Sequence, residues 1–431
     1  MNNQYYIELD RQAQSILTLN DQGNYTVPTK GLYPFQWNWD SALVALGYAS
    51  FDTDRAWREI ETLMRAQWES GMVPHIVFWQ DDEGYFPGSK EWGTHHSPPT
   101  SGITQPPVAA TIVRKLYERS GDKDRAAKLI DALDKWHQWF ATARDPEQRG
   151  LVAIIHPWES GRDNLPDWDK PLSFVDTSEV GTYQRRDTQH IDADQRPSET
   201  DYDRYMALVR FGRDRNWDDK AIAADSPFWV ADVGINAILR RAEYDLACLA
   251  ETLGNTQLAT RAHQRAKRLE KGFEGLWSDE LNGYVSLDMH RNEKAQNLSA
   301  GSWLAFYAGH VLPDHAEPMI ALLNSWISQV EFAIPSFDPS HELFDSIRYW
   351  RGPVWAIINW MIADGLAQND HDALAERVRR DTETLISTAG FYEYFCPLTA
   401  KGGGGDSFSW TAAMWLAWVS PTSEKTGIQE S

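Results

Sequence analysis

Two stretches of the sequence each place a carboxyl group among aromatic side chains. HPWESGRDNLPDWDK (156–170) carries Asp163 in a segment whose prolines and glycine prevent a regular helix. GFYEYFCPLTAKGGGGDSFSW (390–410) carries Glu393 as the only acid within the aromatic run FYEYF. Apolar surroundings disfavour the charged form of a carboxyl group and raise its pKa. Both residues are therefore candidates for proton transfer near neutral pH.

Hydrolysis of a glycosidic bond is a reaction that needs two such carboxyl groups, one on each side of the bond. One group must be protonated and donate to the leaving oxygen. The other must be ionised, and it either activates water or attacks the sugar. The two loops supply one candidate each, so we take Asp163 and Glu393 as a possible catalytic pair.

Each carboxyl group also has a structural explanation. Asp163 could be a solvated turn residue, and Glu393 could be a buried glutamate that bridges to an arginine. For the other acids of the first loop, Glu159, Asp167 and Asp169, we prefer the solvated turn, in which an acidic side chain caps the following segment.

Two further aromatic clusters could bind a sugar ring. GLYPFQWNWDSAL (31–43) offers Trp37 and Trp39 for stacking and Asp40 as an acceptor for vicinal hydroxyls. The alternative is that Asp40 caps a helix and the tryptophans fill the core. In YWRGPVW (349–355) the proline suits the first turn of the following helix, which would leave the aromatic residues near the helix end that faces the site.

Motifs for cofactors and metals are absent from the sequence. No phosphate-binding loop, dinucleotide fingerprint or nucleophile elbow occurs, and GGGGDS (402–407) is interpreted as a mobile flap. The segment 192–203 has Pro197 where a calcium loop needs glycine. No His-Glu-x-x-His spacing is present, and Cys248 and Cys396 form no motif. We therefore expect no cofactor and no metal.

The composition limits the classes of molecule that this protein is expected to bind. The formal net charge of -21 argues against nucleic acid and anionic membranes, both of which require a positive surface. The longest apolar runs are too short to cross a bilayer. The N-terminus shows no secretion signal, so we expect a cytoplasmic protein that acts on a small molecule. The 21 tryptophans suit either a helical core or a carbohydrate site. The oligomeric state is left open.

Helical periodicity dominates the chain and predicts an all-α fold. Short polar turns at 120–124 and 253–257 join neighbouring helices, with glycine at or near each helix C-terminus. About six such hairpins can close into a toroid, an (α/α)6 barrel. Helices are expected near the N-terminus and at 54–69, 107–119, 124–143, 199–214, 229–253, 257–276, 317–330, 353–367, 371–388 and 409–418.

The connections between these helices are long and aromatic. They lie near 20–40, 71–106, 151–198, 331–352 and 389–408. Loops of this length in a compact domain are usually functional, and their aromatic content argues against disorder. We expect them to gather over one end of the barrel, with short strands in GLVAIIHPW and GYVSLDMH. Residues 1–420 would form one catalytic domain, followed by a flexible tail, 421–431.

Five motifs together resemble the small, single-domain bacterial members of glycoside hydrolase family 63, in particular those that hydrolyse mannosylglycerate and glucosylglycerate. Each motif is weak alone, but the set is specific and spans residues 23 to 415. The resemblance implies an (α/α)6 barrel, an inverting mechanism and a role in the turnover of compatible solutes. The motifs are GLYPFQWNWDSA, GMVPHIVF, WESGRDNLPDWD, YWRGPVW and FYEYFCP…FSWTAA.

The resemblance also implies individual roles. Asp163 would be the general acid, and Glu393 would be the base that activates water. The substrate carboxylate would need a cation, for which Arg196 is the matching candidate and Arg204 the second choice. The sugar would contact Trp37, Asn38, Trp39, Asp40, Gln105, Trp158, Gly161, Trp350 and Trp355, and Tyr33, Tyr85 and Tyr349 would lie near the glycerate.

Phe408 bears on the sugar, because the glucosylglycerate enzymes are expected to carry glutamine there. It favours 2-O-α-D-mannosyl-D-glycerate over 2-O-α-D-glucosyl-D-glycerate as substrate. An α-glucosidase acting on an uncharged disaccharide is the first alternative. A sugar epimerase or isomerase would need a histidine pair, for which His75, His95, His96, His156 and His190 are available. A non-catalytic sugar-binding protein would leave Glu393 unexplained.

Overall fold

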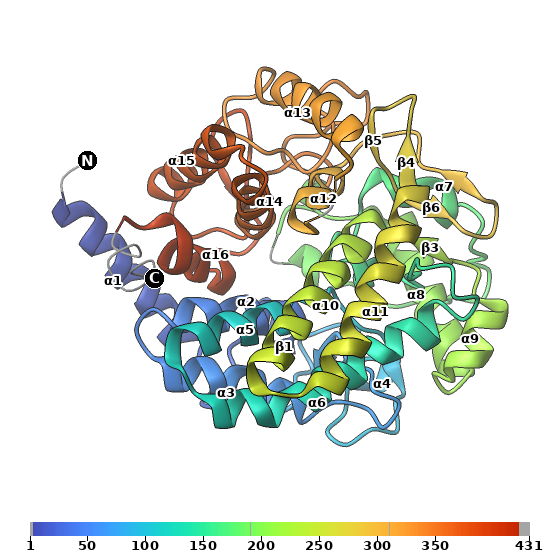
Figure 1. Ribbon diagram of the computed structural model, residues 1–431. Helices are drawn as coiled ribbons and strands as arrows, with labels where there is room; N and C mark the ends of the chain where they lie inside the picture. Colours follow the sequence, from blue (N-terminus) through green and yellow to red (C-terminus); the bar gives the residue numbers. More distant parts are fainter. Residues whose placement is uncertain (1–2, 190, 310, 422–431) are drawn as a thin grey trace.

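Six helices form an inner ring in the computed structural model, which describes residues 3–189, 191–309 and 311–421. Each inner helix packs against the next, and the last packs against the first, which closes the ring (Figure 1). The inner helices are α2 (Asn38–Tyr48), α5 (Ala109–Ser120), α10 (Val233–Leu253), α12 (Leu304–Tyr307), α14 (Ala356–Gln368) and α16 (Ser409–Met414).

A second set of helices alternates with these along the chain and lies outside them. Figure 1 shows α10 beside α11 and α14 beside α15. The predicted (α/α)6 barrel is thereby confirmed. The outer helices are α1 (Asn3–Asn20), α3 (Thr53–Met64), α6 (Lys123–Trp139), α11 (Thr256–Phe273), α13 (Pro313–Ile327) and α15 (Asp372–Ala389).

The two kinds of connection lie at opposite ends of the ring. An inner helix is joined to the following outer helix by a short turn. Gly121 adopts φ +67° after α5, and the Asp122 side chain then accepts a hydrogen bond from the backbone N–H of Arg125 to begin α6. Each outer helix returns to the next inner helix through a longer segment, so these segments meet over the N-termini of the inner helices.

The long connections carry the smaller elements. Strand β8 pairs antiparallel with β9, with Tyr394 opposite Gly403. The helices are α4 (Ser89–Trp92), α7 (Asp169–Leu172), α8 (Glu199–Asp214) and α9 (Asp219–Asp225). The strands are β1 (Gln36–Trp37), β2 (Ile76–Val77), β3 (Val230–Ala231), β4 (Trp277–Ser278), β5 (Gly283–Tyr284), β6 (Leu287–Asp288), β7 (Glu293–Lys294), β8 (Tyr394–Phe395) and β9 (Gly402–Gly403). They form the pairs β1–β2, β4–β5 and β8–β9 and the three-stranded sheet β3–β6–β7.

The starts of helices α2 and α14 differ from what the sequence indicated. The sequence did not predict α2, because the tryptophans near its start obscure the apolar periodicity. Asp40 does not cap that helix but lies in its first turn, and Trp37 occupies the capping position without a side-chain bond. Pro353 is not in the first turn of α14, which begins at Ala356. In both segments the chain enters the inner ring in extended conformation and turns helical a few residues later.

No helix within the described ranges is long and apolar enough to cross a membrane. The predicted C-terminal tail lies outside the described residues from position 422 onward.

Candidate active site

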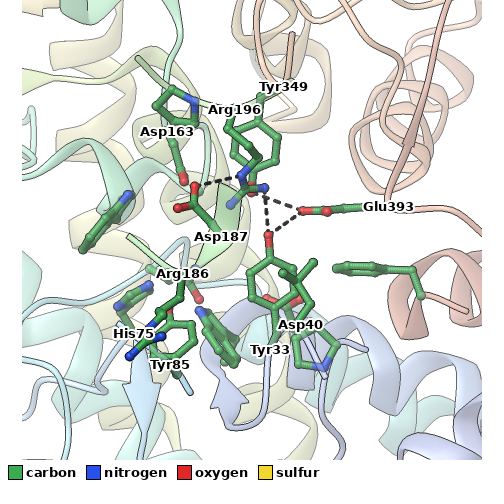
Figure 2. Close-up of a pocket in the computed structure, with 18 of the residues that line it drawn as sticks. Tyr33, Asp40, His75, Tyr85, Asp163, Arg186, Asp187, Arg196, Tyr349 and Glu393 are labelled. Carbon is green, nitrogen blue, oxygen red and sulfur yellow. Dashed lines mark hydrogen bonds and ion pairs between the residues drawn. The ribbon is translucent and has the colours of Figure 1, made fainter. Parts of the chain in front are cut away.

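A cavity lies where the long connections meet the first turns of α2 and α16 (Figure 2). Asp163 and Glu393 both line it and enter from different sides. Ten of the other predicted residues share this lining, namely Tyr33, Trp37, Trp39, Asp40, Tyr85, Gln105, Trp158, Gly161, Arg196 and Tyr349. The structure thus brings together residues that are up to 360 positions apart in sequence.

The backbone of Asp163 is fixed by its neighbours. Arg162 forms a buried ion pair with Asp232, and the Asn164 side chain accepts a hydrogen bond from the backbone N–H of Trp350 at 2.9 Å. Tyr205 donates its hydroxyl to the backbone carbonyl of Asp163 at 2.8 Å. These contacts leave the Asp163 side chain directed into the cavity (Figure 2).

Gly161 allows this loop to approach the Trp39 ring closely. It adopts φ +67°, and a Cβ atom there would lie 2.6 Å from the ring of Trp39. Any larger residue would displace the indole or the loop, so glycine is needed for this close approach to Trp39.

The Asp163 carboxyl group is suited to hold a proton. Burial raises its pKa to about 7; the Arg196 guanidinium opposes this rise, and the Glu393 carboxylate adds to it. Within the described part of the chain, no side chain of another residue donates a hydrogen bond to this carboxyl. The group can therefore be protonated near neutral pH and release its proton without breaking a strong internal bond.

Glu393 is surrounded by hydrogen-bond donors. The hydroxyls of Tyr33 and Tyr349 each donate to Oε1 at 3.2 Å, and the backbone N–H of Gly405 donates to Oε2 at 3.0 Å. Burial raises the pKa of Glu393, while Arg196 and these three donors lower it. Donors stabilise the ionised form of a carboxyl group, so Glu393 is the better candidate for the base.

The glycine-rich segment is bound to Glu393 instead of forming a separate flap. Strand β9 pairs with β8, and the backbone N–H of Glu393 donates to the Gly405 carbonyl at 2.8 Å. Strand β8 covers the last two residues of the run FYEYF. The segment 402–407 was expected to be a mobile flap. In the structure it belongs to the hairpin, which supplies one of the three donors to the Glu393 carboxylate.

Arg196 lines the cavity, and its guanidinium lies over the Tyr349 ring, 4.3 Å from the ring centroid (Figure 2). It donates to the Tyr33 hydroxyl at 2.9 Å and to Asp187 Oδ2 at 3.2 Å. Arg204, the second choice, pairs with Asp201 on the same helix and is absent from the lining. Of the two predicted arginines, Arg196 therefore lines the cavity and Arg204 does not; Arg186 also lines it.

The sugar-sized part of the cavity is lined by indoles around Asp40. Trp37, Trp39 and Trp158 provide ring surfaces, and the Gln105 side chain accepts from the backbone N–H of Trp39 at 3.3 Å. Burial and then the neighbouring Glu393 raise the pKa of Asp40. Stacking surfaces beside a polar group with two oxygens suit a pyranose ring and its hydroxyls.

Three predicted sugar contacts lie outside this lining. Asn38 is buried and donates to the backbone carbonyls of Val73 and Pro74. Trp350 and Trp355 stack on each other with centroids 3.7 Å apart, behind Tyr349. The Asn38 amide nitrogen is engaged by the backbone and the two indoles stack on each other, so a sugar contact for any of the three stays a prediction.

Two acids of the first loop are buried and not solvated as expected. Glu159 receives the Arg144 guanidinium at 3.0 Å and the backbone N–H of Ile155 at 2.8 Å. Asp167 accepts from Ser286 at 2.8 Å, and burial raises its pKa to about 6. Asp169 is partly exposed and pairs with Arg351 at 2.5 Å. Glu159 and Asp167 therefore support the loop that presents Asp163.

The cavity also includes residues that were not among the predicted site residues. Arg186 and Asp187 come from the stretch YQRRDTQ (183–189). Its run of charges within a long loop was the sequence signal that could have identified them. His75 was considered only as one of several histidines for an epimerase. The additional residues are Pro28, Gly31, Leu32, His75, Gly84, Phe86, Arg186, Asp187, Pro197, Tyr202, Phe408 and Trp410.

Possible metal ligands and the predicted histidines are placed by the structure as follows. The described residues contain no cluster of three or more His, Cys, Asp or Glu side chains that could hold a metal. Of the histidines considered for an epimerase, His75 alone lines the described cavity, and burial lowers its pKa well below the usual value. His190 lies outside the described residues.

Comparisons with known proteins agree with this geometry. The sequence profile described as the mannosylglycerate hydrolase MGH1-like glycoside hydrolase domain matches residues 33–411. The chain is 45% identical over 415 residues to mannosylglycerate hydrolase MGH1 of Selaginella moellendorffii, covering 95% of this chain and 85% of that one. It is 33% identical over 446 residues to glucosylglycerate hydrolase of Mycolicibacterium hassiacum, covering 96% and 98%.

A solved structure shows the same fold. The family 63 mannosylglycerate hydrolase from Thermus thermophilus, crystallised with Tris and D-glycerate, superimposes with a TM-score of 0.93 at 43% identity. The match covers 95% of this chain and 99% of that one. The chain therefore belongs to the mannosylglycerate hydrolase-like glycoside hydrolases of family 63.

Proposed function

We propose that this enzyme is an inverting α-glycosidase that hydrolyses 2-O-α-D-mannosyl-D-glycerate, with the 2-O-α-D-glucosyl compound as a second substrate. The observation that carries the assignment is the contrast between the two carboxyl groups. Asp163 receives no side-chain donor from another described residue, whereas Glu393 receives three donors. That difference suits an acid on one side of the bond and an ionised base on the other.

In the proposed reaction, Asp163 gives its proton to the glycosidic oxygen as the bond between that oxygen and the anomeric carbon breaks. Glu393 takes a proton from a water molecule, whose oxygen attacks the anomeric carbon from the opposite face. Glycerate leaves with its hydroxyl restored, and the sugar is released with its anomeric configuration inverted. Asp163 then regains a proton, and Glu393 releases one, before the next turnover.

The glycerate carboxylate is assigned to Arg196. Its guanidinium lines the cavity and is always charged, so it can form charge-assisted hydrogen bonds with a carboxylate. Tyr33, Tyr85 and Tyr349 lie on the same lining and would surround the glycerate. The mannosylglycerate and glucosylglycerate hydrolases named above support a glycosylglycerate as the substrate class, and Phe408 favours mannose.

Release of D-glycerate tests the catalytic pair. We expect Asp163→Ala and Glu393→Ala each to lower kcat by about 10³-fold or more, because each removes a proton-transfer step. Asp169→Ala is the matched control, since that acid lies in the same loop and pairs with Arg351 outside the cavity. Activity within tenfold of wild type for either catalytic variant would overturn the assignment.

A glucosidase that acts on an uncharged disaccharide is the second candidate, because the sugar-binding indoles alone would suit it. Arg196→Ala distinguishes the two. A glycosylglycerate enzyme should lose about 10²-fold or more in kcat/KM when a charge partner is removed, and a disaccharide enzyme should lose little. Arg204→Ala is the control, because Arg204 is absent from the lining and should leave both activities unchanged.

A further inference from the structure

Asp187 lines the cavity and accepts hydrogen bonds from two arginines, Arg185 and Arg196, of which Figure 2 shows Arg196. Its Oδ1 accepts from Arg185 Nε at 3.0 Å, and its Oδ2 accepts from Arg185 Nη2 at 2.7 Å. The same Oδ2 accepts from Arg196 Nε at 3.2 Å. One carboxylate therefore connects Arg196, which lines the cavity, to Arg185, which does not.

Arg185 anchors this carboxylate independently of any substrate. Its guanidinium lies 4.4 Å from the centroid of the Tyr202 ring, and Nη1 donates to the backbone carbonyl of Pro197 at 2.8 Å. The two-pronged bond to Asp187 then fixes both carboxylate oxygens. Asp187 consequently holds its position even before a ligand enters the cavity.

The contacts of Arg196 explain why its Nε needs a fixed acceptor. Tyr33 takes one donor of Nη1, and the Tyr349 ring lies against one face of the guanidinium. Both of these contacts are made by neutral aromatic side chains. The bond from Nε to Asp187 adds a charged acceptor at a third point of the guanidinium and leaves the remaining donors available to the cavity.

We propose that Asp187 is a positioning residue that orients Arg196 towards a substrate carboxylate and offsets the guanidinium charge beside Asp163. The first role rests on the proposed function, because it assumes an anionic substrate. The second role follows from the charges alone. A lone guanidinium would favour the ionised form of the neighbouring acid, and an adjacent carboxylate counteracts it.

The electrostatic role is consistent with the groups that face Asp163. Arg196 lowers the pKa of Asp163, whereas Glu393 and Asp187 raise it. Asp187 itself has a pKa held below its usual value by Arg185 and Arg196, against the effect of burial, so it is ionised throughout the neutral range. Asp40 on α2 and the hydroxyls of Tyr85, Tyr205 and Tyr349 are further titratable groups that interact with Asp163, and Arg186 and His75 line the same cavity.

The test compares Asp187→Asn with Asp192→Asn in the full-length enzyme. Both changes remove one negative charge from the same loop, but Asp192 is exposed. The carboxyl carbon of Asp163 is titrated by ¹³C NMR, and D-glycerate binding is measured by calorimetry. In Asp187→Asn we expect the pKa of Asp163 to fall by about 1 and the Kd for D-glycerate to rise about tenfold or more. Asp192→Asn should change neither value.

Asp187→Glu separates charge from position, and it replaces Asp187→Asn if that variant fails to fold. It should keep the pKa of Asp163 near the wild-type value and weaken D-glycerate binding about tenfold, because the longer side chain moves the acceptor. An unchanged pKa of Asp163 together with unchanged glycerate binding in Asp187→Asn would overturn the proposal. Failure of the wild-type enzyme to bind D-glycerate would instead refute the proposed substrate, and the NMR titration would still decide the electrostatic role.

Discussion

At the scale of single residues, the site depends on two carboxyl groups whose surroundings differ. Both are removed from bulk water, which raises both pKa values. Hydrogen bonds then make the two pKa values differ. Tyr33, Tyr349 and Gly405 stabilise the Glu393 carboxylate, and nothing equivalent reaches Asp163 in the described chain. The position of the donors, and not the residue type, assigns the roles of acid and base.

This arrangement predicts a bell-shaped dependence of kcat/KM on pH. Activity should fall as the pH rises through about 7, where Asp163 loses its proton. It should also fall in acid as Glu393 becomes protonated. Tyr349→Phe removes one donor to the Glu393 carboxylate, so the pKa of Glu393 should rise and the acid limb should move upward by about 1 pH unit.

Tyr394→Phe is the control for that profile. Its hydroxyl donates to Gln195 at 3.2 Å and not to Glu393, although the ring packs beside Tyr349. Its acid limb should stay at the wild-type pH. If Tyr349→Phe left the acid limb unmoved as well, the limb would not report the ionisation of Glu393.

The sequence predicts residue roles only where chemistry leaves a local pattern. Glu393 within an aromatic run and Asp163 beside a glycine bend could be singled out in this way. Asn38 could not be judged, because its contacts with Val73 and Pro74 come from a distant segment. Asp187 was overlooked for a similar reason, since its charge looks solvated until the fold places Arg196 against it.

At the scale of elements, short structures fix the catalytic groups more closely than the helices do. Strands β8 and β9 are two residues each, yet their pairing places Gly404 and Gly405 against Glu393. Gly404 adopts φ +71°, and a Cβ atom there would lie 2.2 Å from Glu393 Oε2. The glycines are thus needed to let the hairpin backbone approach the carboxylate.

Gly404→Ala should therefore reduce turnover more than stability. The added methyl group would displace the Glu393 carboxylate, and we expect kcat to fall about 10²-fold. Gly121→Ala is the matched control, since Gly121 adopts φ +67° in open space away from the site. Both variants should lose about 1 kcal/mol of unfolding free energy, measured by chemical denaturation, because alanine disfavours positive φ. Equal kcat values in the two variants would contradict the role of the hairpin.

The long helices could be predicted because their apolar periodicity is local, and the capping residues Asp122 and Asn255 mark where outer helices begin. The connecting segments could be recognised as functional from their length and aromatic content. The paths of these segments could not be predicted. They depend on hydrogen bonds such as the one between Gln195 and Gly404, which are 209 positions apart in the sequence. Helix α2 was missed for a different reason, since its first turn carries site residues in place of a regular pattern.

At the scale of the whole molecule, the barrel positions residues that lie far apart in the sequence. Short turns at one end hold the helix pairs together, and the long segments converge at the other end over the inner helices. The acid and the arginine come from the segment between α6 and α10, and the base comes from the segment between α15 and α16, so the closed ring sets the distance between the acid and the base. The formal net charge of -21 leaves Arg196, held by Asp187, as a local cation suited to attract a small anion into this end.

The most direct test of the account is proton NMR of 2-O-α-D-mannosyl-D-glycerate and 2-O-α-D-glucosyl-D-glycerate during hydrolysis by the wild-type enzyme. The account predicts that D-glycerate appears together with the β-anomer of the free sugar, before mutarotation, and faster from the mannosyl compound. Initial appearance of the α-anomer would contradict the roles given to Asp163 and Glu393, because it requires a retaining mechanism.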